Sequence, residues 1–432
     1  MLLYNVIGDF VKASIKDKKK NARLFPIYRM ISADLLFFYA VSFLFLTQIK
    51  GFSASQVLYL ESIYTLLKIA VQVPCLILIE KFGKCKSLII ANLAICVQTL
   101  FFIFATGFFS IVIAYIFCAF GFVIKIICEP SLLYESVTTK KGKGFFALID
   151  GRGTAYYFYL EGVSSVIAGI LYTVNGYIPM FMCLAFSMIS AFLASRFIDI
   201  PSEEKEYKGI KKYFKDLKSG FKYIFKSNRL KAFLLFYAIF AGIISLITVY
   251  RRSLLTDLNV SPVYFGMIFA FLNIICGIAS LNQDKFHDSF KNKTLKVISL
   301  TFIISCIVVG LICILPLQHD VTIAFVLLMF LAQFIVRGPV PTLAKRYLSN
   351  FSTANIRTRI FSANDITESI GRTIIVFLGG LLLDVTNTSN AFIIVGILGT
   401  IILLLILNYM KSRIGLKPED YKTEDIQYIE MR

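Results

Sequence analysis

The chain has 432 residues, of which 57% are hydrophobic, and its mean hydropathy is +0.76. These values exclude an ordinary water-soluble domain and indicate a chain that crosses a membrane many times. The formal net charge of +19 at pH 7 indicates that lysines and arginines face an anionic inner leaflet, and it requires no nucleic-acid partner.

A helix needs about 20 mostly apolar residues to cross a lipid bilayer. Twelve segments of the sequence meet this criterion, which predicts an all-α polytopic membrane protein with twelve transmembrane helices. The segments are 27–49, 54–79, 87–106, 109–133, 145–173, 177–196, 231–254, 262–283, 297–315, 321–344, 360–383 and 388–410.

Lysines and arginines concentrate in both terminal segments and in alternate connections between the spans. Lys50 is the single basic residue in the connections on the other side. The positive-inside rule therefore predicts a multi-pass protein of the plasma membrane with both termini in the cytoplasm. In the N-terminal segment 1–26, apolar residues at helical spacing precede the lysines, which favours an interfacial helix over a cleaved signal peptide.

A short acid-basic-aromatic turn ends the second long apolar segment of each half of the chain. This repetition predicts two six-helix halves, 27–197 and 229–411, followed by a cytoplasmic tail at 412–432. The residues of the two turns are Glu80, Lys81, Gly83 and Lys84 in the first half, and Asp284 and Lys285 in the second.

The segment 198–228 between the halves is too polar to cross a membrane. Its apolar residues fall three or four apart with lysines between them, which predicts a basic amphipathic helix. Two placements stay open, namely on the inner leaflet of the bilayer or packed against the protein.

Charged side chains inside the spans cost about 2.5–3.5 kcal/mol each on insertion scales, so they usually face a cavity or a partner. Two pairs of these charges lie four positions apart, which is the spacing of an ion pair on one helix: Glu368 with Arg372, and Lys125 with Glu129. We expect both pairs to hold helices together, with Arg337 joining the first. The charged residues that we single out inside the spans are Asp34, Glu61, Lys68, Lys125, Glu129, Glu161, Arg337, Asp365, Glu368 and Arg372.

Asp34 and Glu161 have no basic residue four positions away in the sequence. A buried carboxylate of this kind can take up and release a proton, so both residues, together with Glu129, are candidates for proton coupling. The alternative is that they are only hydrogen-bonded or paired across helices.

Arg251 and Arg252 lie at the outer end of the seventh span. They are candidates to attract an anionic group of a substrate in a cavity, and the alternative is that they extend to lipid headgroups. Among the many aromatic residues, Tyr39 and Tyr157 are candidates to line the same cavity.

Six spans, a basic linker and six further spans resemble the major facilitator superfamily. The turn at 76–86 resembles the superfamily motif G-x-x-x-D-R-x-G-R-R-K, although Leu76 replaces the first glycine and Glu80 replaces the aspartate. The runs EPSLLYES at 129–136 and DGR at 150–152, and the stretch 347–371, resemble the drug-efflux-like bacterial branch.

This resemblance implies alternating access, with Glu135 and Arg152 beside the motif turn at the cytoplasmic mouth. The antiporter motif of the fifth span keeps Gly162 and Gly169 but lacks its proline, which weakens the expectation of proton antiport.

The sequence does not indicate an enzyme, because it contains neither a Walker phosphate-binding loop nor a Ser/His/Asp set in a plausible context. The nine cysteines lack the spacing of metal ligands, so we expect no metal and no cofactor. We expect a monomeric secondary-active exporter of amphipathic small molecules or drugs, driven by protons. The alternatives are a dedicated importer or exporter of one metabolite, peptide or lipid, and a non-transporting sensor or immunity protein.

Overall fold

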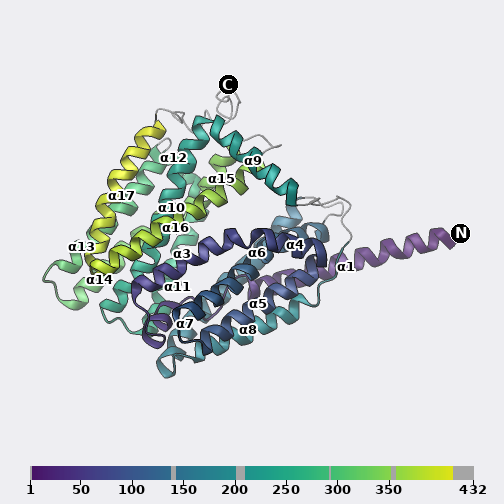
Figure 1. Cartoon of the computed structure of the whole chain (residues 1–432), viewed down its shortest axis with the longest axis horizontal. Coiled ribbons are helices and arrows are strands. Elements are labelled where there is room, and N and C mark those ends of the chain that lie inside the picture. Colours follow the sequence, from purple (N-terminus) through teal and green to yellow (C-terminus); the bar gives the residue numbers. More distant parts are fainter. Residues whose placement is uncertain (1, 138–142, 201–209, 291–292, 352–356, 412–432) are drawn as a thin grey trace. The chain divides into compact units, whose positions relative to one another are not determined.

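The computed structural model describes residues 2–137, 143–200, 210–290, 293–351 and 357–411 (Figure 1). The chain divides into two compact units. Unit 1 comprises Met1–Gly51, Leu67–Ile210 and Pro262–Met267, and unit 2 comprises Phe52–Leu66, Lys211–Ser261 and Ile268–Arg432. Each unit includes a short segment from the other half of the sequence, and the division into six-helix halves stays a prediction.

In unit 1, α5 packs between α6 and α8, and α1 contacts α6, α7 and α8 (Figure 1). Tyr28, Cys75, Leu88 and Cys128 belong to the buried core at one end of these helices. The helices of this unit are α1 (Leu2–Ser32), α2 (Ser42–Leu44), the π-helix η1 (Phe45–Ile49), α4 (Gln72–Phe82), α5 (Lys84–Phe104), α6 (Phe108–Val137), α7 (Lys143–Val174) and α8 (Ile178–Ala194).

In unit 2, α10 packs against α16 and α17, and α13 packs against α14 and α17. Helices α3 (Ala54–Ala70) and α11 (Pro262–Leu281) contribute residues to both units. The others are α9 (Ile210–Lys226), α10 (Asn228–Asp257), α12 (Gln283–Phe290), α13 (Thr294–Ile314), α14 (His319–Arg337), α15 (Val340–Asn350), α16 (Arg357–Val385) and α17 (Thr388–Lys411).

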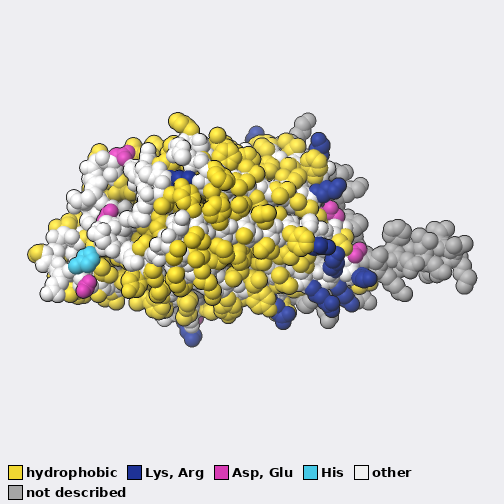
Figure 2. Space-filling model, turned by 90° about the horizontal axis from the view of Figure 1, so that it is seen from below, with side chains coloured by type: hydrophobic (Ala, Val, Ile, Leu, Met, Phe, Trp, Pro, Cys, Tyr) yellow, Lys and Arg dark blue, Asp and Glu magenta, His cyan; other side chains and the backbone are white. Residues whose placement is uncertain are grey.

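Nine helices in the described part of the chain are long and apolar enough to cross a membrane. A tenth span results if α3 and α4, which meet at an angle of 46°, are taken together. Hydrophobic side chains cover most of the face in Figure 2, and Phe109 and Leu281 are 82% and 86% exposed. The all-α multi-pass architecture is thus confirmed, whereas the count of twelve spans stays a prediction.

The predicted amphipathic linker helix is α9, and it packs on the protein. Asp216 of α9 forms an ion pair of 3.0 Å with Arg359 of α16. A Cβ atom added at Gly220 would lie 2.6 Å from the carbonyl oxygen of Arg359, so glycine permits this close approach. Phe214 and Phe225 are 51% and 68% exposed, which leaves apolar surface on α9.

The turn between α4 and α5 depends on Gly83. This residue has φ +80° and ψ 171°, a backbone conformation that is essentially restricted to glycine. The turn places the first helical N–H groups of α5 opposite Asp199, whose Oδ1 accepts from the Cys85 N–H at 3.0 Å. The carboxylate thus caps the positive end of α5.

Replacing Gly83 with alanine is expected to destabilise the protein by about 1–3 kcal/mol, because an L-residue is strained in this conformation. The added Cβ would also lie 3.4 Å from the Asp199 carboxylate. Thermal unfolding of the purified protein in detergent measures the loss. Gly162→Ala is the matched control, because this helical glycine has nothing within 4 Å of an added Cβ. Equal melting temperatures for the two variants would contradict the expected strain.

Candidate functional site

The first predicted span, 27–49, is interrupted near its middle. Helix α1 ends at Ser32, and residues 33–41 form turns before α2 begins at Ser42. Asp34 lies in this break, where its Oδ1 accepts a hydrogen bond of 3.0 Å from the Leu35 N–H. Such a side-chain bond competes with helical hydrogen bonding and favours a break. Phe37 has φ 65°, which is a genuine outlier for a bulky residue.

Lys125 of α6 lies against the C-terminal end of α1 at this break. Lys125 is only 4% exposed, and its ammonium group donates a hydrogen bond to the carbonyl oxygen of Ser32. The carbonyl end of a helix carries partial negative charge, so it stabilises a cation. The Asp34 carboxylate and Glu129 also attract Lys125. The break in the first span and this buried cation therefore stabilise each other.

Glu129 forms its ion pair with Arg29 of α1, across the helix interface. The expectation that Lys125 and Glu129 form a pair on one helix was wrong in this respect, although Glu129 does act electrostatically on Lys125. Glu129 is 1% exposed and Arg29 is 31% exposed. The spacing of charges along one helix could not indicate Arg29, because it lies 100 positions from Glu129.

Tyr157 of α7 lies near both of the main candidate proton-coupling residues. The carboxylates of Asp34 and Glu161 are each close enough to act on its hydroxyl group electrostatically. Tyr39, in the break itself, lies close enough to Asp34 to act on its carboxylate. Unit 1 therefore gathers the predicted residues Asp34, Tyr39, Tyr157 and Glu161 around the interrupted span.

The motif turn is tied to the end of α6. Lys84 forms an ion pair of 2.5 Å with Glu135, and both side chains are largely buried. Glu80 and Lys81 are exposed at the end of α4, where Lys81 lies over the ring of Phe82. Arg152 is exposed on α7. Of the residues predicted at the cytoplasmic mouth, the structure thus pairs Lys84 with Glu135.

In unit 2, Glu368 and Arg372 form the predicted ion pair, with a separation of 2.5 Å. Arg337 does not join it through an ion pair, and its guanidinium carbon lies 5.2 Å from the ring centre of Phe334. Asp365 is exposed on α16. Lys285 is exposed on α12, and the side chain of Asp284 lies outside the described residues.

Arg251 is completely buried on α10, so the alternative that it extends to lipid headgroups is wrong for this residue. Its Nη1 donates to Gln333 Oε1 at 3.0 Å, and its Nη2 donates to Thr248 Oγ1 at 3.1 Å. The neighbouring Arg252 is half-buried and lies 5.8 Å from the ring centre of Phe269.

Another contact of unit 2 was not predicted. The Tyr59 hydroxyl of α3 donates to the Asp384 carboxylate at the end of α16. A Cβ added at Gly380 would lie 2.5 Å from the Tyr59 ring, so the two helices approach closely here. Glu61 and Lys68 are half-buried on the same helix α3. Sequence patterns gave no indication of this pairing, because its partners lie 325 residues apart.

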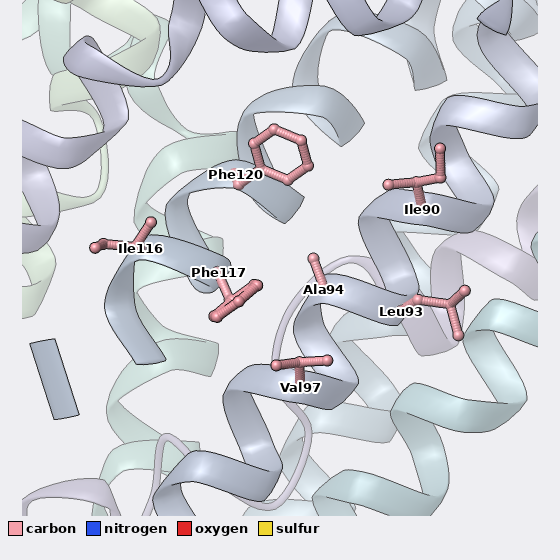
Figure 3. A pocket seen from close by; sticks show the side chains of 7 residues that line it. All are labelled: Ile90, Leu93, Ala94, Val97, Ile116, Phe117 and Phe120. Carbon is pink, nitrogen blue, oxygen red and sulfur yellow. The ribbon is translucent and has the colours of Figure 1, made fainter. Parts of the chain in front are cut away.

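A cavity of about 390 Å³ lies between α5 and α6 in unit 1 (Figure 3). Its lining is entirely apolar, so it offers no group to orient a polar solute, and it suits a lipid acyl chain. Among the described residues, no group of three His, Cys, Asp or Glu side chains could hold a metal ion. The lining residues are Ile90, Leu93, Ala94, Val97, Ile116, Phe117 and Phe120.

The sequence profile of the Major Facilitator Superfamily matches residues 29–344, which is more than half of the chain. The chain belongs to the major facilitator superfamily. It is a membrane transporter. Its family and its several membrane-length apolar helices both indicate a multi-pass membrane protein. No curated protein sequence matches it significantly. These findings point away from an enzyme.

Solved structures of superfamily transporters share the fold at low sequence identity. The nucleoside transporter NupG has a TM-score of 0.71 and 11% identity, with coverage of 91% of this chain and 99% of that chain. A D-xylose–proton symporter has a TM-score of 0.67 and 11% identity, with coverage of 94% and 99%. A POT family transporter in complex with 5-aminolevulinic acid has a TM-score of 0.61 and 12% identity, with coverage of 92% and 96%.

These likenesses concern the fold alone, because the identities are so low. They do not distinguish the drug-efflux-like branch from other branches of the major facilitator superfamily. The position of the chain within the superfamily therefore stays a prediction, and the substrate must be argued from the side chains.

Proposed function

We propose that this transporter carries one small, polar and charged metabolite by alternating access, coupled to protons through Asp34. The observation that carries the proposal is the arrangement around the interrupted first span, where Asp34, Lys125 and the Arg29–Glu129 pair come together inside unit 1. Interrupted membrane helices with buried ionisable residues typically form solute and ion sites.

Proton uptake at Asp34 has a direct structural consequence. Lys125 is held by the Ser32 carbonyl and attracted by the Asp34 carboxylate. Glu129 attracts Lys125 as well, so neutralising Asp34 removes one of three attractions and weakens the hold of α6 on the end of α1. Protonation is thereby linked to the geometry of the break, which is what coupling between a proton and a conformational change requires.

The charged interior favours a dedicated metabolite over the export of amphipathic drugs. A drug site needs mainly apolar and aromatic walls, whereas the polar groups of unit 1 and the arginines of unit 2 match a charged solute. The related folds also include transporters named for a nucleoside and for D-xylose. The same proposal places the transporter in the plasma membrane with both termini in the cytoplasm. It also includes function as a monomer.

Uptake into proteoliposomes with an imposed pH gradient tests the proposed function. The panel contains adenosine, D-xylose, dialanine, succinate and glucose 6-phosphate as polar solutes, and ethidium as an amphipathic cation. We expect accumulation of a charged solute, namely dialanine, succinate or glucose 6-phosphate, and a protonophore should abolish it. Uptake of adenosine or D-xylose alone would contradict a charged solute. Movement of ethidium alone would favour drug export instead. Binding of a panel compound without any movement would favour the non-transporting sensor.

A further inference from the structure

The largest fully buried side chain of the described residues is Arg251, in the C-terminal part of α10. Two of its donors are used, one by Gln333 and one by Thr248, and both partners are neutral. The guanidinium carbon lies 4.5 Å from the ring centre of Phe334 and 5.9 Å from that of Phe330. Arg251 is thus held in place by neutral and aromatic groups.

The charged neighbours of Arg251 are themselves arginines. Arg337 and Arg252 are near enough to repel it, and Arg337 lies on the same Phe334 ring. Within the described ranges, neither Arg251 nor Arg337 forms an ion pair with a carboxylate. Glu368 is already paired with Arg372. The positive charges of Arg251, which is buried, and of Arg337, which is half-buried, therefore exceed the carboxylate charge paired with them.

Such an excess is costly unless an anion compensates it. Burying a guanidinium group costs more than neutral hydrogen bonds return, and ionisable residues inside membrane spans usually pair or serve a function. The amide of Gln333 is fixed in turn, because its Nε2 donates to the Cys306 sulfur at 3.6 Å. The residues around Arg251 are consequently organised, yet they supply no negative charge.

One edge of the Arg251 guanidinium group is not fully hydrogen-bonded. The Nε–H is buried and has no hydrogen-bond partner. Arginine has five N–H donors in a planar fork, and Nε with an adjacent Nη matches two oxygens of a carboxylate or phosphate. A ligand oxyanion at this edge would satisfy the Nε–H and neutralise the local charge together.

We infer that Arg251 is the anion-binding residue of the transporter and takes a carboxylate or phosphate group of its solute, with Arg337 adding positive potential. The inference rests on the proposed function, in which the solute is small and charged. It differs from a structural role for Arg251 in a testable way. A structural bond between α10 and α14 needs no anion, whereas a binding site is stabilised by one.

Thermal unfolding of the purified protein in neutral detergent provides the test. The probes are sodium succinate and sodium phosphate, with sodium chloride at equal ionic strength as the reference. We expect one oxyanion to raise the melting temperature of the wild type above its value in chloride. In Arg251→Gln, the same shift should require at least about a tenfold higher concentration, because a charge-assisted hydrogen bond is lost.

The matched control is Arg196→Gln, since Arg196 also stacks on an aromatic ring, 4.6 Å from the centre of Phe192, but is exposed. It should keep the full shift. In chloride alone, Arg251→Gln should melt no lower than the wild type. Absence of an oxyanion-specific shift in the wild type, or its retention in Arg251→Gln, would overturn the inference. If Arg251→Gln does not fold, Arg251→Lys replaces it, and an unchanged shift in that variant overturns the bidentate site.

Nanodiscs distinguish a solute from a lipid headgroup as the source of the anion. In one outcome, phosphatidylglycerol stabilises the wild type more than phosphatidylcholine does, while Arg251→Gln loses this difference and soluble anions have no effect. This result would assign the site to lipid phosphate and overturn the inference that the anion belongs to the solute. The unfolding assay involves no transport. If a panel compound is taken up with protons but no oxyanion binds, this site alone is overturned. If an oxyanion binds but no panel compound is taken up, the proposed function alone is overturned.

Discussion

Replacing Glu129 with glutamine is expected to destabilise the purified transporter by about 3 kcal/mol. Breaking a buried ion pair by removing one partner typically costs about 3–5 kcal/mol, because the other charge is left uncompensated. The lower end applies here because Arg29 keeps 31% exposure, whereas Glu129 has 1%. Glutamine retains the shape of the side chain, so the loss reports the charge. Chemical or thermal unfolding in detergent measures it.

Two further variants identify the origin of this loss. Glu135→Gln removes the acid of the Lys84 pair, whose side chains are 10% and 18% exposed, and we expect a smaller effect because water screens this pair more. Combining Arg29→Met with Glu129→Leu removes both charges and should recover most of the stability. If the double variant is no more stable than Glu129→Gln, the Arg29–Glu129 pair is not the cause.

The residues that the sequence placed correctly interact over short distances along one intact helix. Glu368 and Arg372 lie four positions apart on α16, and they form the ion pair that this spacing predicts. Nine of the twelve apolar segments likewise form membrane-length helices in the described part of the chain, because burial in lipid depends on local hydropathy. These features need no knowledge of how helices pack.

The residues that the sequence misplaced depend on contacts between helices. Lys125 and Glu129 have the spacing of a helical pair, yet Glu129 bonds to Arg29, which lies 100 positions away. The break after Ser32 could not be located because 27–49 is mostly apolar and Arg29 and Asp34 are its only charged residues. The burial of Arg251 could not be predicted for the same reason, because its position near the end of a span suggested exposure. Only packing against Gln333 and Phe334 explains its burial.

Replacing Asp34 with asparagine is expected to abolish proton-driven accumulation while leaving exchange of solute across the membrane intact. If one proton moves with each solute, a difference of one pH unit supports about tenfold accumulation. Asparagine cannot exchange a proton, so the accumulation ratio should fall to about one. Lys125 keeps its bond to the Ser32 carbonyl in this variant, and the protein should remain folded.

The measurement compares gradient-driven uptake with counterflow in the same proteoliposomes, using the polar panel compound that the wild type transports. Asp320→Asn is the matched control, because this aspartate is exposed in the first turn of α14. Glu161→Gln tests the other candidate, whose carboxylate acts on Tyr157 as that of Asp34 does. Loss of accumulation in Glu161→Gln, with full accumulation in Asp34→Asn, would transfer the proton-coupling role to Glu161. Loss of both uptake and counterflow in Asp34→Asn would instead show that this carboxylate is needed for solute binding or for the conformational change itself.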